Sequence, residues 1–182
     1  MESQHKAKGH EQGSQWKLLS ERRFAPFFVA QALAAFNDNL FKNVLVLLAT
    51  FRTSDYTTLA PELLSNLAAG LFILPYVLFS GIAGQLADRY DQTQVLKVVK
   101  ATEIVIMCVA AFGFWRHDIV ILLSALFLMG VHSTFFAPAK YGYLPQVLRS
   151  HEIVGGNGMV EMGTFLAILL GTLAAGLLGE HG

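Results

Sequence analysis

The chain has 182 residues, of which 54% are hydrophobic and only 14% charged, and its mean hydropathy is +0.49. A soluble domain of this length carries far more charge, so the composition excludes an ordinary soluble protein and indicates a membrane protein. The net charge is zero, so no overall field draws the chain toward nucleic acid or an acidic partner.

The predicted elements are a polar tail followed by membrane-crossing helices. Residues 1–23 contain no apolar core of the signal-peptide type, so we expect a retained cytoplasmic tail. Residues 24–182 form the predicted transmembrane domain, an all-α membrane fold. Five of its segments are apolar and long enough to cross a hydrocarbon core of ~30 Å. They cover residues 24–51, 61–87, 95–115, 119–137 and 153–179.

The polar links between these segments are short, so neighbouring helices are expected to run antiparallel as a bundle. Basic residues near helix ends stay on the cytoplasmic side of a membrane. Ten lysines and arginines, Lys140 among them, fall in or near the tail and the second and fourth links, against Arg52 and Arg116 in the opposite links. This bias predicts a cytoplasmic amino terminus. The odd number of segments is expected either for a small five-helix protein or for the amino-terminal piece of a longer one.

The first segment contains polar residues near its centre. Asp38 lies ~21 Å along the helix from Phe24, and a charge facing lipid at that depth costs at least ~2.5–3.5 kcal/mol. Lys42 follows one turn later, in the order that favours an ion pair with Asp38. Asn39 is one of three amides beside them. Two interpretations remain open: a polar knot that joins this helix to its neighbours, or the polar lining of a substrate path.

Other segments contain fewer polar residues. Glu161 is a second intramembrane acid, whereas Glu103 lies close enough to the cytoplasmic start of its helix to extend its carboxylate to the interface. His132 is expected to be a packing histidine. Cys108, the only cysteine, excludes an internal disulfide and is expected to be a small buried hydrophobic residue.

Small residues recur at every fourth position of the last segment, at Gly163, Ala167, Gly171, Ala175 and Gly179. A four-residue repeat keeps them near one face of a helix, where a second backbone can approach closely. The pattern predicts either tight static packing or a surface that moves during transport.

Several motifs resemble a known family. GQLADRY at Gly84 to Tyr90 resembles the loop signature of the major facilitator superfamily. AFNDN, PAKYG and NGMVE, which begin at Ala35, Pro138 and Asn157, together resemble the bacterial lysophospholipid transporter family. FKN, which begins at Phe41, is most similar to members fused to acyltransferase and acyl-activating domains.

The resemblance implies a rocker-switch transporter with two six-helix halves, of which this chain would be an incomplete amino-terminal half. Such a protein moves lysophospholipid, here lysophosphatidylethanolamine, across the bacterial inner membrane by alternating access, for re-acylation. Matched by motif, the substrate-binding acids are Asp38 and Glu161, and we add Lys42 and Asn39 from their positions beside Asp38.

The same resemblance places a gating loop at Gly84, Asp88 and Arg89. The family signature usually continues with glycine and basic residues, whereas residues 91–93 here are DQT. The expected partners are the lipid bilayer, the remaining transporter helices and an acyltransferase or acyl-activating domain in the same or a neighbouring chain. We expect neither a cofactor nor a metal ion.

Two alternatives to lysophospholipid transport make different demands on the sequence. A carrier of a small soluble solute would have a wetter path that is closed to lipid. The membrane part of a bifunctional acyltransferase would show a histidine followed five positions later by an aspartate, and no histidine here has one. The sequence therefore predicts a transporter and not an enzyme.

The predicted orientation can be tested by cysteine accessibility at Ser54 and Gln92. A cysteine at Ser54 should react with an impermeant reagent added from outside, and one at Gln92 should not, because the basic residues hold the second link inside. Labelling of Gln92 but not of Ser54 would reverse the orientation.

Overall fold

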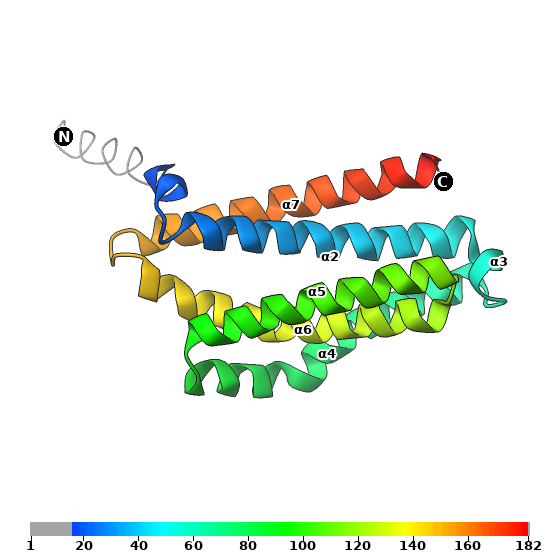
Figure 1. Cartoon of the computed structure of the whole chain (residues 1–182), viewed down its shortest axis with the longest axis horizontal. Coiled ribbons are helices and arrows are strands. Elements are labelled where there is room, and N and C mark those ends of the chain that lie inside the picture. Colours follow the sequence, from blue (N-terminus) through cyan, green and yellow to red (C-terminus); the bar gives the residue numbers. More distant parts are fainter. Residues whose placement is uncertain (1–15, 182) are drawn as a thin grey trace.

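The computed structural model describes residues 16–181, without the side chains of Ala49 and of 179–181. The described chain is entirely helical (Figure 1). The elements are a 3₁₀ helix η1 (Trp16–Ser20) and six α-helices: α2 (Ala25–Phe51), α3 (Thr53–Tyr56), α4 (Pro61–Arg89), α5 (Gln92–Arg116), α6 (Ile119–Val147) and α7 (Ile153–His181). Residues 1–15 of the predicted tail lie outside the described residues.

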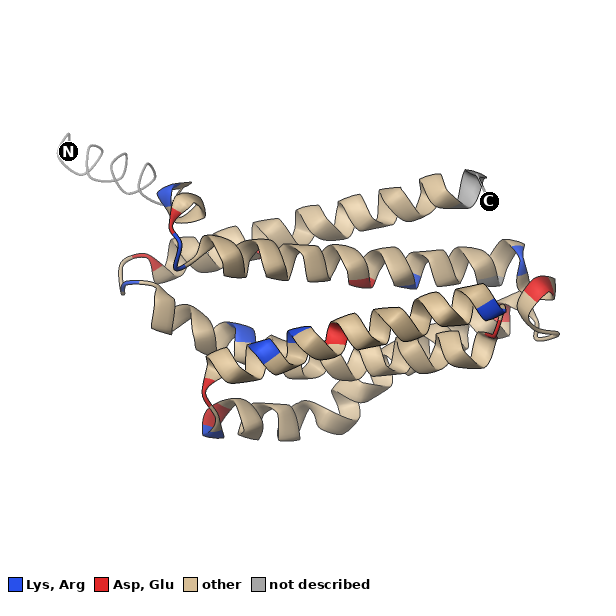
Figure 2. Cartoon of the chain, in the orientation of Figure 1, with Lys and Arg blue, Asp and Glu red and all other residues tan. Residues whose placement is uncertain are grey.

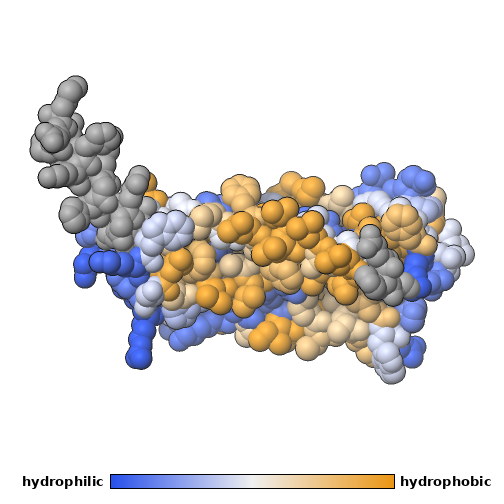
Figure 3. All heavy atoms as spheres, turned by 90° about the horizontal axis from the view of Figure 1, so that it is seen from above, coloured by the Kyte–Doolittle hydropathy of each residue, from blue (hydrophilic) through white to orange (hydrophobic). Residues whose placement is uncertain are grey.

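Five long helices run along the bundle, and the connections between them are short. Three of them, α4, α6 and α7, are long and apolar enough to cross a membrane. The other two, α2 and α5, contain 27 and 25 residues, and both carry charged residues within the helix. A broad hydrophobic band covers one face of the molecule between hydrophilic ends (Figure 3). Large apolar side chains such as Val77, Val120 and Phe165 are 68–74% exposed, as expected for surfaces that face lipid.

The helices pack in two groups that meet through α2 and α4. The most extensive contact joins α2 to α7, and the second group consists of α4, α5 and α6. One buried cluster joins α2, α4, α5 and α6 and includes Phe41, Leu45 and Leu122. A smaller cluster, which includes Leu18, Phe24 and Val160, joins η1, α2, α6 and α7. The two ends of the bundle are therefore held by separate cores.

The small residues of α7 form its contact surface with α2. A Cβ atom placed on Gly171 would lie 2.6 Å from the carbonyl oxygen of Phe36, which is closer than real Cβ contacts. Ala167 and Ala175 are buried in the same surface. The described part of the predicted stripe is therefore tightly packed. Its last member, Gly179, falls outside the residues whose surroundings the structure describes.

Helix α6 continues ten residues beyond its predicted end. The sequence predicts that it stops at Ala137, before Pro138, with a polar link over residues 140–152. Instead Pro138 and Pro145 both lie inside α6, and only residues 148–152 connect it to α7. Proline within a membrane helix is tolerated when neighbouring helices and side chains satisfy the freed backbone groups. The predicted end at Ala137 was therefore wrong, because the helix continues through both prolines.

Helix α4 also contains a proline, and Figure 1 shows this helix bending away from the bundle along its length. Pro75 packs against α6 at Gly130, where an added Cβ would lie 3.0 Å from the proline ring and 2.5 Å from the carbonyl oxygen of Phe72. Proline is a usual cause of such a bend, and glycine at this crossing lets the two backbones meet.

Helix α5 begins three residues earlier than predicted. The Asp91 side chain caps it by accepting a hydrogen bond of 3.0 Å from the Gln94 backbone N–H. This capping role accounts for an acid where the family signature usually has other residues. Cys108 on α5 is exposed, so the prediction of a buried thiol was wrong. Its helix turns another face, with Val99 and Ile106, into the core.

The close approach at Gly171 predicts a position-specific effect. Gly171→Leu should destabilise the folded protein by about 1–3 kcal/mol or more, because the added side chain meets the α2 backbone. Thermal unfolding in detergent measures the change. Gly176→Leu is the matched control on the same helix, since nothing lies within 4 Å of its Cβ position. Equal melting temperatures for the two variants would contradict this packing.

Candidate functional site

Asp38 lies inside the bundle, where α2 faces α6. Its Oδ2 accepts a hydrogen bond of 2.8 Å from the Ser133 hydroxyl. Its other oxygen, Oδ1, is buried and has no hydrogen-bond partner among the described residues. An unmet carboxylate acceptor is costly in an apolar bundle, so the acid is held with unused capacity for a donor.

The predicted ion pair between Asp38 and Lys42 is not formed. Lys42 Nζ instead donates to Asn39 Oδ1 over 3.2 Å and lies 5.5 Å from the centre of the Phe72 ring. Asp38 turns toward Ser133, whereas Lys42 lies beside Asn39 one turn earlier on the same helix. The spacing of four residues allows an ion pair between Asp38 and Lys42 but does not ensure one. Here Ser133 of the neighbouring helix α6 bonds to Asp38 instead.

The amides around Asp38 are used largely by the helices themselves. Asn39 donates to the Ala35 carbonyl over 2.8 Å. Asn43 donates to the Asn39 carbonyl and to the Thr172 hydroxyl of α7, over 2.8 and 3.1 Å. These contacts agree with a polar knot at this level of α2, one of the two interpretations drawn from the sequence.

Glu161 of α7 forms a second polar site with α6. Its Oε1 accepts a hydrogen bond of 2.7 Å from the Tyr141 hydroxyl and lies 3.2 Å from Lys140 Nζ. The Glu161 side chain is 40% exposed and that of Lys140 only 11%. The acid is therefore accessible, while its cation is held in the bundle.

Lys140, which pairs with Glu161, is a candidate site residue that the sequence alone did not identify. The PAKYG motif contains it, but the predicted end of the fourth helix placed it in a cytoplasmic link. The extension of α6 turns this lysine inward. Lys140 is the third residue of PAKYG. This motif and NGMVE, which contains Glu161, resemble the same family, and that shared resemblance could have identified Lys140.

Asp38 of α2 and Glu161 of α7 both bond to α6, but the structure does not bring them together. Their partners on α6, Ser133 and Tyr141, are eight residues apart in the sequence, which is ~12 Å along a helix. Lys42 and Asn39 lie beside the first acid and Lys140 beside the second. The bundle thus presents two separate acidic positions along α6, one buried and one accessible.

A third group of charges joins α5 to α6. Glu103 pairs with Lys100 over 2.9 Å, and His132 Nε2 lies 3.5 Å from the same carboxylate. Glu103 was expected to extend toward the interface but is largely buried, because both partners lie inside the bundle. Figure 2 shows that, apart from such positions on α2, α5 and α6, charged residues gather at the ends of the molecule.

The predicted gating residues lie in the last part of α4, toward its carboxyl-terminal end. Gly84 has open space beside it, and Asp88 and Arg89 are exposed. Within the described chain, neither charge has an ion-pair partner. The Gln92 side chain donates to the Ala87 carbonyl and so ties the end of α4 to the start of α5. The connection is therefore held by Gln92, which lies just outside the signature motif. Asp88 and Arg89 are left free to bind other groups.

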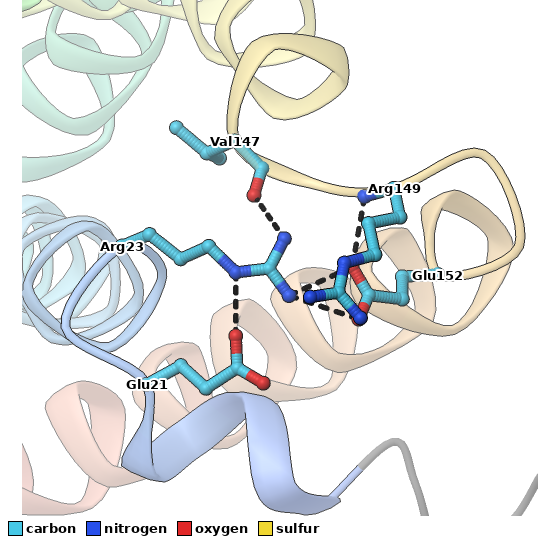
Figure 4. A network of polar contacts seen from close by, with 5 residues as sticks. All are labelled: Glu21, Arg23, Val147, Arg149 and Glu152. Atoms are coloured by element: carbon cyan, nitrogen blue, oxygen red, sulfur yellow. Dashed lines mark hydrogen bonds and ion pairs between the residues drawn. The ribbon is translucent and has the colours of Figure 1, made fainter.

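A cluster at the start of α2 joins η1 to the α6–α7 connection (Figure 4). The Arg23 guanidinium donates to the Val147 carbonyl over 2.6 Å and to both oxygens of Glu152 over 2.9 Å, and it also pairs with Glu21. Glu152 accepts a further bond of 2.8 Å from the Arg149 backbone N–H. That N–H, followed by Arg23, holds the pKa of Glu152 below its usual range. The two carboxylates raise the pKa of Arg23, so the cluster favours its charged form.

Comparisons with known proteins agree with a membrane transporter. A family model described as Major Facilitator Superfamily matches residues 27–182. Lysophospholipid transporter LplT of Cronobacter sakazakii is 30% identical over 165 residues, 89% of this chain and 38% of that protein. The LplT proteins of Escherichia fergusonii and Yersinia enterocolitica are 32% and 29% identical, over 84% and 90% of this chain. The chain spans little more than a third of these relatives. No solved structure matches.

The cluster at Arg23 predicts a pH-dependent contribution to stability. Glu152→Gln should lower the free energy of unfolding by about 1–3 kcal/mol, because charged hydrogen bonds are lost. Since the folded-state pKa of Glu152 is depressed, this contribution is fully present above the ordinary glutamate value of about 4.3 and is lost as the pH falls through the folded-state pKa. Thermal unfolding from pH 7 to pH 3 measures it.

The exposed Glu62 at the start of α4 provides the control. Glu62→Gln should change stability much less than Glu152→Gln at pH 7. If both variants match the unmodified protein at pH 7, the cluster contributes nothing measurable.

Proposed function

Because the chain belongs to the Major Facilitator Superfamily, a family of transporters and not of enzymes, we propose that it is part of a carrier that moves lysophospholipid across the bacterial inner membrane. The expected substrate is lysophosphatidylethanolamine, carried by alternating access toward re-acylation. The names of the relatives support this substrate class. The chain spans only part of their length, so the complete activity would require further helices.

The observation that carries the proposal is the pair formed by Lys140 and Glu161. The head group of lysophosphatidylethanolamine has one phosphate and one ammonium group. Lys140 offers a cation for the phosphate, and Glu161, with its exposed carboxylate, offers an anion for the ammonium. Substrate binding would exchange the internal ion pair for two external ones, so no charge would be left unpaired in the membrane.

Asp38 is proposed as a second acceptor for the head group. Its buried Oδ1 lacks a donor, while Ser133 holds Oδ2. An ammonium group reaching this position would supply the missing donor and a counter-charge. Asn39 is next to Asp38 and Lys42 is one turn further along α2. The two bond to each other and would adjust the local charge and complete the polar lining.

The apolar exterior suits a substrate with an acyl chain. The helices around both acids expose mainly hydrophobic side chains, such as Leu166 and Leu173 on α7, which are 52% and 56% exposed. A carrier for a small soluble solute would need a wetter wall. Gly84, Asp88 and Arg89 are proposed to gate the path by contacting the other half of the transporter from the cytoplasmic end of α4.

The proposed placement is a multi-pass protein of the inner membrane with its amino terminus in the cytoplasm. Its proposed partners are the remaining transporter helices and an acyltransferase or acyl-activating domain in the same or a neighbouring chain. The basic bias of the links supports the orientation. Arg23, just before α2, bonds to the α6–α7 connection. This contact supports placing the start of α2 and that connection on the same side of the membrane.

The role of Asp38 can be separated from a purely structural one by Asp38→Asn. Asparagine keeps an oxygen that accepts from Ser133, so the full-length variant should accumulate normally in membranes. Its transport of lysophosphatidylethanolamine should fall at least about tenfold, because the charge that meets the ammonium is lost. Flipping of labelled lipid in inverted vesicles measures the rate.

Asp55→Asn, in the exposed α3, is the matched control and should transport at the unmodified rate. Normal transport by Asp38→Asn would leave Asp38 as part of a polar knot. Loss of the protein from the membrane would show that the charge is required for folding instead.

A further inference from the structure

Asp38 and Lys42 are opposite charges one turn apart on α2 that do not pair. Ser133 holds one Asp38 oxygen, and the other has no partner among the described residues. Lys42 Nζ donates to Asn39 instead. This spacing favours an ion pair, and a low dielectric strengthens the attraction. Some other group must therefore keep the two charges apart.

The group that lies against Lys42 is the aromatic ring of Phe72 on α4. Lys42 Nζ is 5.5 Å from the centre of this ring, within the ~6 Å over which an aromatic face attracts a cation. The ring is half-buried and packs against the core cluster that contains Phe41 and Leu122. The ammonium group is thus held toward α4 by a ring that the core itself supports.

Phe72 is fixed by contacts on both sides. A Cβ atom placed on Gly130 of α6 would lie 2.5 Å from the Phe72 carbonyl oxygen, so the backbones of α4 and α6 meet at this residue. The Phe72 ring also packs against Tyr76 one turn later, with 6.2 Å between the ring centres. The ring that holds the ammonium is therefore in place before any ligand binds, as a supporting residue of a preformed site should be.

The same turn of α4 also reaches the acid. The Tyr76 hydroxyl interacts with Ser133 and with the charge of Asp38, and Ser133 donates to Asp38. One turn of α4 thus acts on both charges through different groups. Phe72 holds the ammonium of Lys42, and Tyr76 acts on the carboxylate through Ser133. This arrangement accounts for the absence of the ion pair that the sequence predicts.

We propose that Phe72 is a positioning residue that holds Lys42 away from Asp38, so that an ammonium and a carboxylate stay open to the two ends of a zwitterionic head group. In an ethanolamine phospholipid two carbons join the phosphate to the ammonium, so the head group needs two separate counter-charges. Lys140 and Glu161 form a closed pair that has to open first. The identity of the ligand rests on the proposed function, whereas the separation of the charges does not.

A double-mutant cycle in the full-length protein tests the separation. The melting temperatures of Asp38→Asn, Lys42→Gln and the double variant are measured in detergent. Because the two side chains are held apart, the two losses should be close to additive. In a Phe72→Leu background the charges should pair, and the double variant should then lose clearly less than the sum. Phe72→Met, which keeps a long apolar side chain without a ring, should behave in the same way.

Binding of radiolabelled lysophosphatidylethanolamine tests the consequence for the ligand. Phe72→Leu should weaken binding about 2- to 30-fold, the factor that corresponds to a cation–π contact, because the ligand then has to separate the new pair. Phe72→Tyr keeps the aromatic face and should restore both binding and additivity. Phe165→Leu is the matched control, since it removes the same ring from a 68% exposed position on α7, and it should change neither measurement.

Additive losses in either Phe72 variant without a ring would overturn the proposal, as would strongly non-additive losses in the otherwise unmodified protein. Equal binding by Phe72→Leu and Phe72→Tyr would overturn it as well. The cycle requires no lipid, so its outcome is independent of the proposed transport. If the cycle gives the expected result and lysophosphatidylethanolamine does not bind, the proposed substrate is wrong and the positioning role of Phe72 stands.

Discussion

The contact between α2 and α7 is the constraint on which the rest of the structure depends. At Gly171 the backbone of α2 comes so close that no side chain fits. Inside a membrane the hydrophobic effect does not drive helices together, so close packing and hydrogen bonds must hold them. Gln31 forms such bonds at the same contact: its Nε2 donates to the Val160 carbonyl over 3.2 Å, and its Oε1 accepts from the Thr164 hydroxyl of α7 over 3.0 Å. This contact fixes Asp38 of α2 and Glu161 of α7 relative to each other.

Charges within the bundle are accommodated by partners on neighbouring helices rather than on their own. Asp38 bonds to Ser133 and Glu161 to Tyr141, both on α6. Glu103 is the exception, because its main partner Lys100 lies one turn away on the same helix. Helix α6 therefore supports both Asp38 and Glu161, so a movement of this helix would affect both acids.

The general architecture could be predicted from the sequence because membrane helices depend on length and hydrophobicity, which are local properties. The positions of the long helices and the small-residue surface at Gly171 follow from such patterns. The end of α6 could not be predicted, because the tolerance of Pro138 depends on packing against other helices. The partner of Lys42 was missed for a related reason, since it depends on where Ser133 holds Asp38.

The two prolines near the end of α6 have a mechanical consequence for the site. Each proline removes one backbone hydrogen bond from the helix, and Lys140 and Tyr141 lie between them. A helix bends more easily where such bonds are missing. Lys140 and Tyr141, which bond to Glu161, therefore lie on a segment of α6 that bends easily. Ser133, which bonds to Asp38, lies on a stiffer part of the same helix. Exchange of the ion pair at Glu161 would thus act on the most easily bent segment of α6 and would tilt its carboxyl-terminal end without displacing Asp38.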